Sequence, residues 1–114
     1  MIDEDRMHVA TALNGSGQAF VFYLIQAMQE RAVEEGLDPD DARVLAAQTF
    51  EGAAETVQRS DRALDDLIDA VCSPGGTTIE GMDVLFDSDV DAVVGDALTA
   101  ARRRSEELAG DAEE

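Results

Sequence analysis

Apolar residues recur along most of the chain at intervals of three and four positions, the spacing of one face of an α-helix. The clearest start signal is Asp38-Pro39-Asp40-Asp41, because it combines an Asp N-cap, a first-turn proline and acids that favour the helix dipole. A stripe at helical spacing follows this signal: Ala42, Leu45, Ala46, Thr49, Phe50, Ala53 and Val57. We therefore predict a long helix that begins at Asp38.

An earlier segment, residues 18–35, predicts another long helix, opened by Gly15-Ser16-Gly17 and ended by Gly36. Its first half, residues 19–25, has the propensity of a strand. The good helix formers that follow, with no turn signal before Gly36, favour one continuous helix. Because this helix is apolar nearly all round at its start, we expect other protein to surround it, most simply a second subunit.

Three more helices are predicted in the second half of the chain. Two short ones carry the apolar stripes Leu64, Leu67, Ile68, Val71 and Ile79, Met82, Leu85, Phe86. The last begins near Ser88 and ends at Gly110, with Arg102 and Arg103 placed to pair with Glu106 and Glu107 four residues later. Since no strand pattern survives, the predicted class is all-α, with about five helices.

Alanine makes up much of the predicted core, and only five aromatic residues are present. Alanines bury little area each, so burial within one chain stabilises the fold only modestly. Together with the all-round apolar first helix, this indicates at least a homodimer. Gly52 interrupts its helix and favours close approach of another backbone, while Cys72 is most simply a small buried hydrophobe.

Charge then narrows the classes of function. The 114 residues carry 26 acids against 8 bases, a net charge of −18, and every base is Arg. This balance argues against nucleic acid and against anionic membranes as partners. It resembles the composition of proteins from salt-accumulating halophiles. The start lacks the positive region of a signal peptide, and residues 19–25 are far too short to span a bilayer. With a single cysteine, we expect a soluble, cytoplasmic protein.

Candidate chemistry is concentrated at one interruption, Ser73-Pro74-Gly75-Gly76-Thr77-Thr78. Backbone N–H groups at a helix start, flanked by hydroxyls, suit a small anion such as a carboxylate; the alternative is a helix-to-helix turn whose hydroxyls only cap the helix. Elsewhere the only histidine, His8, has no catalytic signature around it. No metal-ligand pattern organises the carboxylates and no nucleotide-binding glycine loop is seen, so neither a metal nor a cofactor site is predicted in this chain.

The stretch from Ser73 to Gly81, SPGGTTIEG, resembles the C-terminal signature of pyrroline-5-carboxylate reductase. The resemblance extends over nearly the whole chain, through Thr11-Ala12-Leu13-Asn14-Gly15-Ser16-Gly17, Ala47-Gln48-Thr49 with Gly52-Ala53-Ala54, and Arg104-Ser105-Glu106-Glu107-Leu108. It departs at Gln18-Ala19-Phe20, where the family usually has Pro-Ala-Tyr. This departure removes a preorganised helix start and a tyrosine hydroxyl near the site.

The resemblance implies an enzyme of proline biosynthesis that reduces 1-pyrroline-5-carboxylate to L-proline with NAD(P)H. It implies a helical C-terminal domain interlocked as a homodimer or higher homo-oligomer, and a separate N-terminal Rossmann domain for the cofactor. By the motif, the Ser73 hydroxyl and the N–H groups of Gly76, Thr77 and Thr78 would hold the substrate carboxylate. The Thr78 hydroxyl would act at the ring nitrogen as the catalytic group.

On this interpretation residues 1–14 are a linker from an absent cofactor domain, residues 15–110 form the dimerisation and substrate-binding domain, and residues 111–114 are an acidic tail. The chain alone would then be inactive. The alternative is a non-catalytic helical oligomerisation module derived from the same family. A carboxylate metal-binding bundle is a third, weaker reading.

Overall fold

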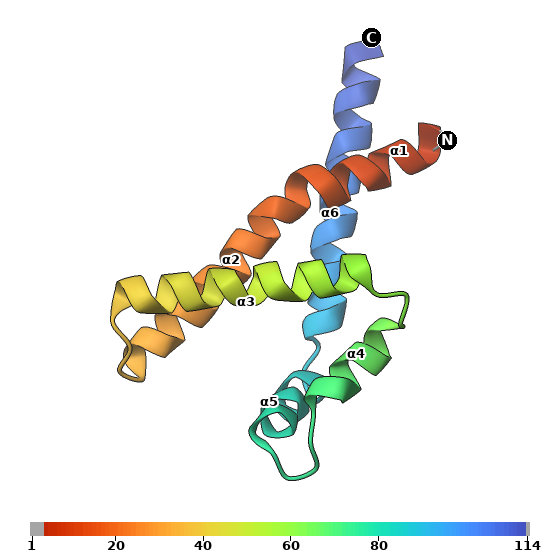
Figure 1. The fold of residues 1–114 in the computed structure, drawn as a ribbon. Coiled ribbons are helices and arrows are strands. Elements are labelled where there is room, and N and C mark those ends of the chain that lie inside the picture. Colours follow the sequence, from red (N-terminus) through yellow and green to blue (C-terminus); the bar gives the residue numbers. More distant parts are fainter. Residues whose placement is uncertain (1–3, 114) are drawn as a thin grey trace. The chain divides into compact units, whose positions relative to one another are not determined.

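The computed structural model describes residues 4–113, and every regular element there is helical. The elements are α1 (Glu4–Thr11), the π-helix η1 (Ala12–Ser16), α2 (Gly17–Glu34), α3 (Pro39–Arg59), α4 (Leu64–Val71), α5 (Thr77–Phe86) and α6 (Val90–Glu113) (Figure 1). Since α1, η1 and α2 follow one another without a break, they count as one segment, and residues 4–113 form five separate helical segments. The all-α class and the number of helices are confirmed.

The first helix starts much earlier than predicted. Gly15-Ser16-Gly17 does not open it but lies inside a continuous run from Glu4 to Glu34. The junction is a π-helical turn, in which the N–H of Gly17 donates to the carbonyl of Ala12, five residues back. Glycine permits a break without requiring one, and both Thr11 and Gly17 keep right-handed helical angles. The segment 1–14, predicted as a linker, is therefore helical from Glu4 onward.

One compact unit of the chain joins residues up to Leu24 with residues from Asp89 onward. Within it, α1 and η1 pack across α6 (Figure 1). The crossing buries Ala12, which is 2% exposed, because a methyl group lets two helix backbones approach closely. Nearby, His8 Nδ1 and Ser105 Oγ form a hydrogen bond of 2.9 Å between α1 and α6. The lone histidine thus lies in a helix–helix contact.

The other unit, residues 25–88, contains the end of α2 and helices α3 to α5. Gly36 has a φ of 112°, a left-handed value suited to glycine, and the chain leaves α2 there as predicted. The Asp38 carboxylate accepts from the backbone N–H groups of Asp40 at 3.0 Å and Asp41 at 3.4 Å. The predicted N-cap is confirmed, and the first turn of α3 buries Ala42.

The C-terminal helix differs from the prediction at its end. Gly110 does not close α6, which continues to Glu113. Arg102 pairs with Glu106 at 2.7 Å, as the spacing of four predicted. The predicted pair of Arg103 with Glu107 is wrong. Glu107 instead forms an ion pair of 3.0 Å with Arg104, three residues before it. Both spacings bring side chains together on a helix surface, so spacing alone does not select between them.

Few side chains are buried within a single chain. Among the described residues only Ala12, Ala42 and Ala46 fall in the buried class. Large apolar side chains are instead exposed, including Phe22 at 66% and Tyr23 at 72%. The predicted apolar face of α2 is therefore present but not covered by this chain.

Two further predictions about packing are not met inside the chain. A methyl group added at Gly52 would have nothing within 4 Å, so no backbone of the same chain approaches it. Cys72 is only half-buried, as the residue that follows the last turn of α4. Both positions were expected to be covered, and both lie where the single chain leaves surface open. Within residues 4–113, no helix has the length and apolar character needed to cross a membrane.

Candidate functional site

The candidate site is the connection between α4 and α5, which lies wholly within the unit of residues 25–88. Helix α4 ends at Val71, and the N–H of Cys72 donates to the carbonyls of Ile68 and Asp69 at 3.2 Å each. Pro74 cannot continue a helix and keeps the residue before it extended. The chain therefore leaves α4 and turns within four residues, as Figure 1 shows between the two helices.

That turn is closed by a backbone hydrogen bond. The N–H of Gly76 donates to the carbonyl of Ser73 at 2.9 Å. Proline at the second position and a glycine with a φ of 73° at the third identify it as a type II β-turn. Gly75 is needed there because L-residues rarely adopt this angle. Gly76 is favoured for a different reason, since a Cβ on it would lie 3.2 Å from the Ser73 carbonyl oxygen, a tight contact that a small shift of the turn would have to relieve.

Helix α5 begins immediately after the turn, with Gly76 as its N-cap. A glycine cap offers no side chain to the first helical N–H groups, so those of Thr77 and Thr78 have no partner in the described part of the chain. They lie at the positive end of the helix dipole, where an anion is stabilised. The Gly76 N–H differs from the prediction in being already occupied by the Ser73 carbonyl.

Three hydroxyl groups flank these donors. The side chains of Ser73 and Thr77 are exposed, whereas Thr78 is half-buried. Across residues 4–113, none of the three hydroxyls forms a hydrogen bond with another protein group, so none acts as a helix cap. The purely structural interpretation of the motif, in which the hydroxyls cap the helix, is therefore not what this geometry shows.

The predicted site residues Ser73, Gly76, Thr77 and Thr78 are thus brought together by one turn and one helix start. Gly75 was not among them, although its positive φ holds the turn in shape. A Pro-Gly pair is a recognised signal for a type II turn, and this signal was available in the sequence. Glu80 lies in the first turn of α5 and places a negative charge near the same donors.

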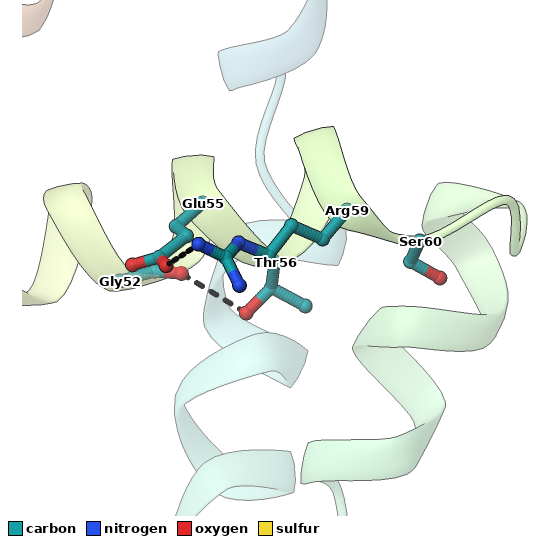
Figure 2. Close-up of a pocket in the computed structure, with 5 residues that line it drawn as sticks. All are labelled: Gly52, Glu55, Thr56, Arg59 and Ser60. Carbon is teal, nitrogen blue, oxygen red and sulfur yellow. Dashed lines mark hydrogen bonds and ion pairs between the residues drawn. The ribbon is translucent and has the colours of Figure 1, made fainter.

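Two shallow, open hollows are lined by residues other than those of this turn. One runs along α3 beside Gly52, Glu55, Thr56, Arg59 and Ser60 (Figure 2). Its Arg59 and Glu55 pair at 3.1 Å, and the Thr56 hydroxyl donates to the Gly52 carbonyl at 3.0 Å, so its polar groups are satisfied along their own helix. The second hollow is lined by Leu13, Asn14, Gly17, Gln18, Val21 and Phe22. Neither contains a described cluster of metal-binding side chains.

Fold and turn together define a helical module with N–H groups that have no partner in the described residues at the start of α5, and with many exposed apolar side chains. Comparison with known proteins gives the family. The sequence profile described as pyrroline-5-carboxylate reductase dimerisation matches residues 4–108. The chain belongs to this family.

Similar proteins include full-length enzymes. The chain is 42% identical over 107 residues to the pyrroline-5-carboxylate reductase of Methanosarcina acetivorans, covering 94% of this chain and 40% of that protein. For the Escherichia coli reductase the identity is 39% over 108 residues, covering 95% and 40%. This chain therefore spans about two fifths of the length of these relatives.

Solved structures show the same fold. A pyrroline-5-carboxylate reductase from Coxiella burnetii matches with a TM-score of 0.90 and 37% identity, covering 95% of this chain and 40% of that one. The Plasmodium falciparum enzyme, solved with NADP bound, matches with a TM-score of 0.88 and 34% identity, covering 94% and 41%. The predicted family is confirmed, and so is its helical fold.

Proposed function

We propose that this chain is the dimerisation and substrate-binding domain of an NAD(P)H-dependent pyrroline-5-carboxylate reductase, which reduces 1-pyrroline-5-carboxylate to L-proline. The observation that carries the proposal is the match to reductases over more than nine tenths of the chain at 39–42% identity. The uncharged turn before α5 agrees with it, because it offers N–H donors to a carboxylate. We further propose a cytoplasmic location and no nucleic-acid partner, on the grounds of the −18 charge and the single cysteine.

The domain boundaries form part of this proposal. Residues 15–110 would be the dimerisation and substrate-binding domain, residues 1–14 the connection from an N-terminal cofactor domain, and residues 111–114 an acidic tail. The support is the length of the relatives, of which this chain spans 40%. The cofactor, NAD(P)H, would be bound by that other domain, as no residue of this chain is proposed to hold it.

At the site, the substrate carboxylate would accept from the N–H groups of Thr77 and Thr78 and from the Ser73 hydroxyl. The N–H of Gly76 would take part only by sharing its hydrogen with the Ser73 carbonyl, to which it already donates. Carboxylate oxygens each accept more than one hydrogen bond, so three donors from one turn match the ligand. The free N–H groups at the start of α5 are what supports this assignment.

Reduction of the substrate C=N bond adds a hydride to carbon and a proton to nitrogen. NAD(P)H supplies the hydride when it is bound. The Thr78 hydroxyl would donate a hydrogen bond to the ring nitrogen and so orient the imine or help to protonate it. Thr78 is half-buried and follows the proposed carboxylate donor Thr77 directly, which agrees with a ligand whose carboxylate and nitrogen are close together.

A two-part assay tests the enzymatic role. The chain is mixed with the separately purified N-terminal domain of the Methanosarcina relative, and NADPH oxidation is followed with 1-pyrroline-5-carboxylate as substrate. We expect activity only when both parts are present. Titration of the chain with L-proline should also protect the Thr77 and Thr78 amides from hydrogen exchange, whereas L-prolinamide, which lacks the carboxylate, should not.

A non-catalytic oligomerisation module is the second candidate. The observation that favours it is the presence of Gln18 and Phe20 where the family usually has Pro and Tyr. It predicts an assembled chain whose turn amides exchange equally fast with and without L-proline. That result, with no turnover in the two-part assay, would replace the enzymatic proposal by this one.

We also propose that two copies associate as a homodimer, or as a higher homo-oligomer built from it. The support is the exposure of large apolar side chains on α2 and the family description, which names dimerisation. Sedimentation equilibrium would measure the mass in solution directly.

A further inference from the structure

Charge is distributed very unevenly along the chain. Residues 9–29 contain no charged side chain, although 30% of the whole sequence is charged. These 21 residues cover the end of α1, all of η1 and most of α2. All 34 charged residues therefore lie in the rest of the chain.

The uncharged run also exposes large apolar side chains, as other parts of the chain do, for example Val84 at 71%. Phe22 and Tyr23 are 66% and 72% exposed, and Leu13 is 63% exposed. The open hollow along η1 and α2 is lined by six residues of this run, all of them uncharged. A surface without charge is the part of an acidic protein that a second copy can cover without bringing like charges into contact.

Outside the run, the negative charge is poorly compensated. The ion pairs of Arg31, Arg59, Arg102 and Arg104 each join side chains three or four positions apart on one helix. Such local pairs neutralise a few acids but connect no two helices. With 26 acids and 8 bases, two associating copies would each bring a charge of −18. The two copies therefore repel each other over a distance that is set by the screening length of the salt solution.

We propose that ionic strength controls the association of two copies through the uncharged surface of residues 9–29. This inference rests on the proposed homodimer and adds its regulation. The apolar contact drives association, and the surrounding charge opposes it. The screening length is about 10 Å at 0.1 M salt and about 3 Å at 1 M, so the repulsion between the copies disappears over this range while the uncharged contact is retained.

The test measures the dimer dissociation constant of the chain by sedimentation equilibrium from about 0.05 M to about 3 M KCl. We expect the constant to fall at least about tenfold between 0.1 M and 1 M and then to level off, since screening is nearly complete there. A matched series with sucrose separates screening from a general strengthening of apolar contacts, because sucrose favours burial without adding ions.

Two charge variants sharpen the test. Replacing the exposed acids Glu30, Glu35, Glu51 and Asp96 by their amides reduces the net negative charge from −18 to −14. This change should shift the midpoint of association to lower salt. Replacing Arg31, Arg59 and Arg104 by Gln increases the net negative charge to −21. This change should shift the midpoint of association to higher salt. Their ion pairs are exposed and contribute little to stability, so the fold should be kept.

The outcomes are distinct. A dissociation constant that changes less than twofold with KCl and is the same in both variants overturns the proposal but leaves the homodimer in place. Equal effects of sucrose and KCl also overturn it, since screening would not be the cause. A chain that stays monomeric in 3 M KCl overturns the proposed homodimer itself.

Discussion

Gly75, in the turn before α5, has a φ of 73°. This angle costs residues with an L side chain about 1–2 kcal/mol. Gly76 has an ordinary φ of −86°, but a Cβ there would press on the Ser73 carbonyl oxygen at 3.2 Å. The two glycines are therefore favoured for different reasons, Gly75 for its backbone angle and Gly76 for the limited space beside it. Between them they leave the N–H groups of Thr77 and Thr78 free.

We predict that Gly75→Ala destabilises the chain by about 1–2 kcal/mol, because alanine must adopt the left-handed angle or distort the turn. The measurement is the free energy of unfolding in urea. Gly110→Ala is the control, since Gly110 lies in α6 with nothing near its Cβ position. It should be neutral or stabilise by up to about 1 kcal/mol. Equal losses in both variants would contradict the assigned role of Gly75.

Thr78→Val should reduce turnover in the two-part assay by about tenfold or more, since it removes the proposed hydrogen bond to the ring nitrogen while keeping the side-chain shape. Thr78→Ser keeps the hydroxyl and should restore most of the activity. Thr77→Val alters an exposed neighbour whose backbone N–H is unchanged, so its effect should be small. Full activity in Thr78→Val would exclude the hydroxyl from the chemistry.

At the scale of elements, the start of α3 was predictable and the continuity of the first helix was not. Asp38 and Pro39 set the start of α3 through local contacts that the sequence specifies, and the carboxylate accepts from two N–H groups as expected. Gly15-Ser16-Gly17 is equally visible in the sequence, yet the helix passes through it with a π-turn. A glycine lowers helix propensity by about 1 kcal/mol, which the packing of α1 and η1 on α6 can offset.

Asp38→Ala should lower the free energy of unfolding by about 1 kcal/mol, because the first N–H groups of α3 lose their side-chain acceptor. Asp38→Asn keeps an acceptor oxygen in the same place and should cost much less. Urea unfolding of the two variants under identical salt conditions gives the comparison. The N-cap would be shown to contribute nothing if alanine and asparagine had the same effect.

For the whole molecule, the important feature is apolar surface that the chain does not bury. Only three alanines are buried among the described residues, while Phe22 and Tyr23 are exposed on α2. Burial of apolar surface stabilises a protein by about 25 cal/mol per Å². A fold with this little internal core should therefore gain much of its hydrophobic stabilisation by association. Stability and assembly should therefore be linked, and the unfolding midpoint should rise with protein concentration.

Phe22→Gln should weaken the homodimer by roughly tenfold or more in dissociation constant, because an aromatic side chain contributes on the order of 1.5–3 kcal/mol when it is fully buried. Phe22→Leu keeps an apolar side chain at the same position and serves as the control. Sedimentation equilibrium in 1 M KCl measures both. Unchanged association in the glutamine variant would place Phe22 outside the interface.

The sequence by itself determined the helical class, the start of α3, the position of the interruption at residues 73–78 and the family, since these depend on local patterns and motifs. It also indicated a need for a second subunit, because residues 19–25 are apolar all round. Tertiary structure decided that α1 continues into α2, that Arg104 and not Arg103 pairs with Glu107, and that the Gly76 N–H is already occupied. Each of these depends on packing or on the choice between similar local geometries, whose small energy differences no local pattern records.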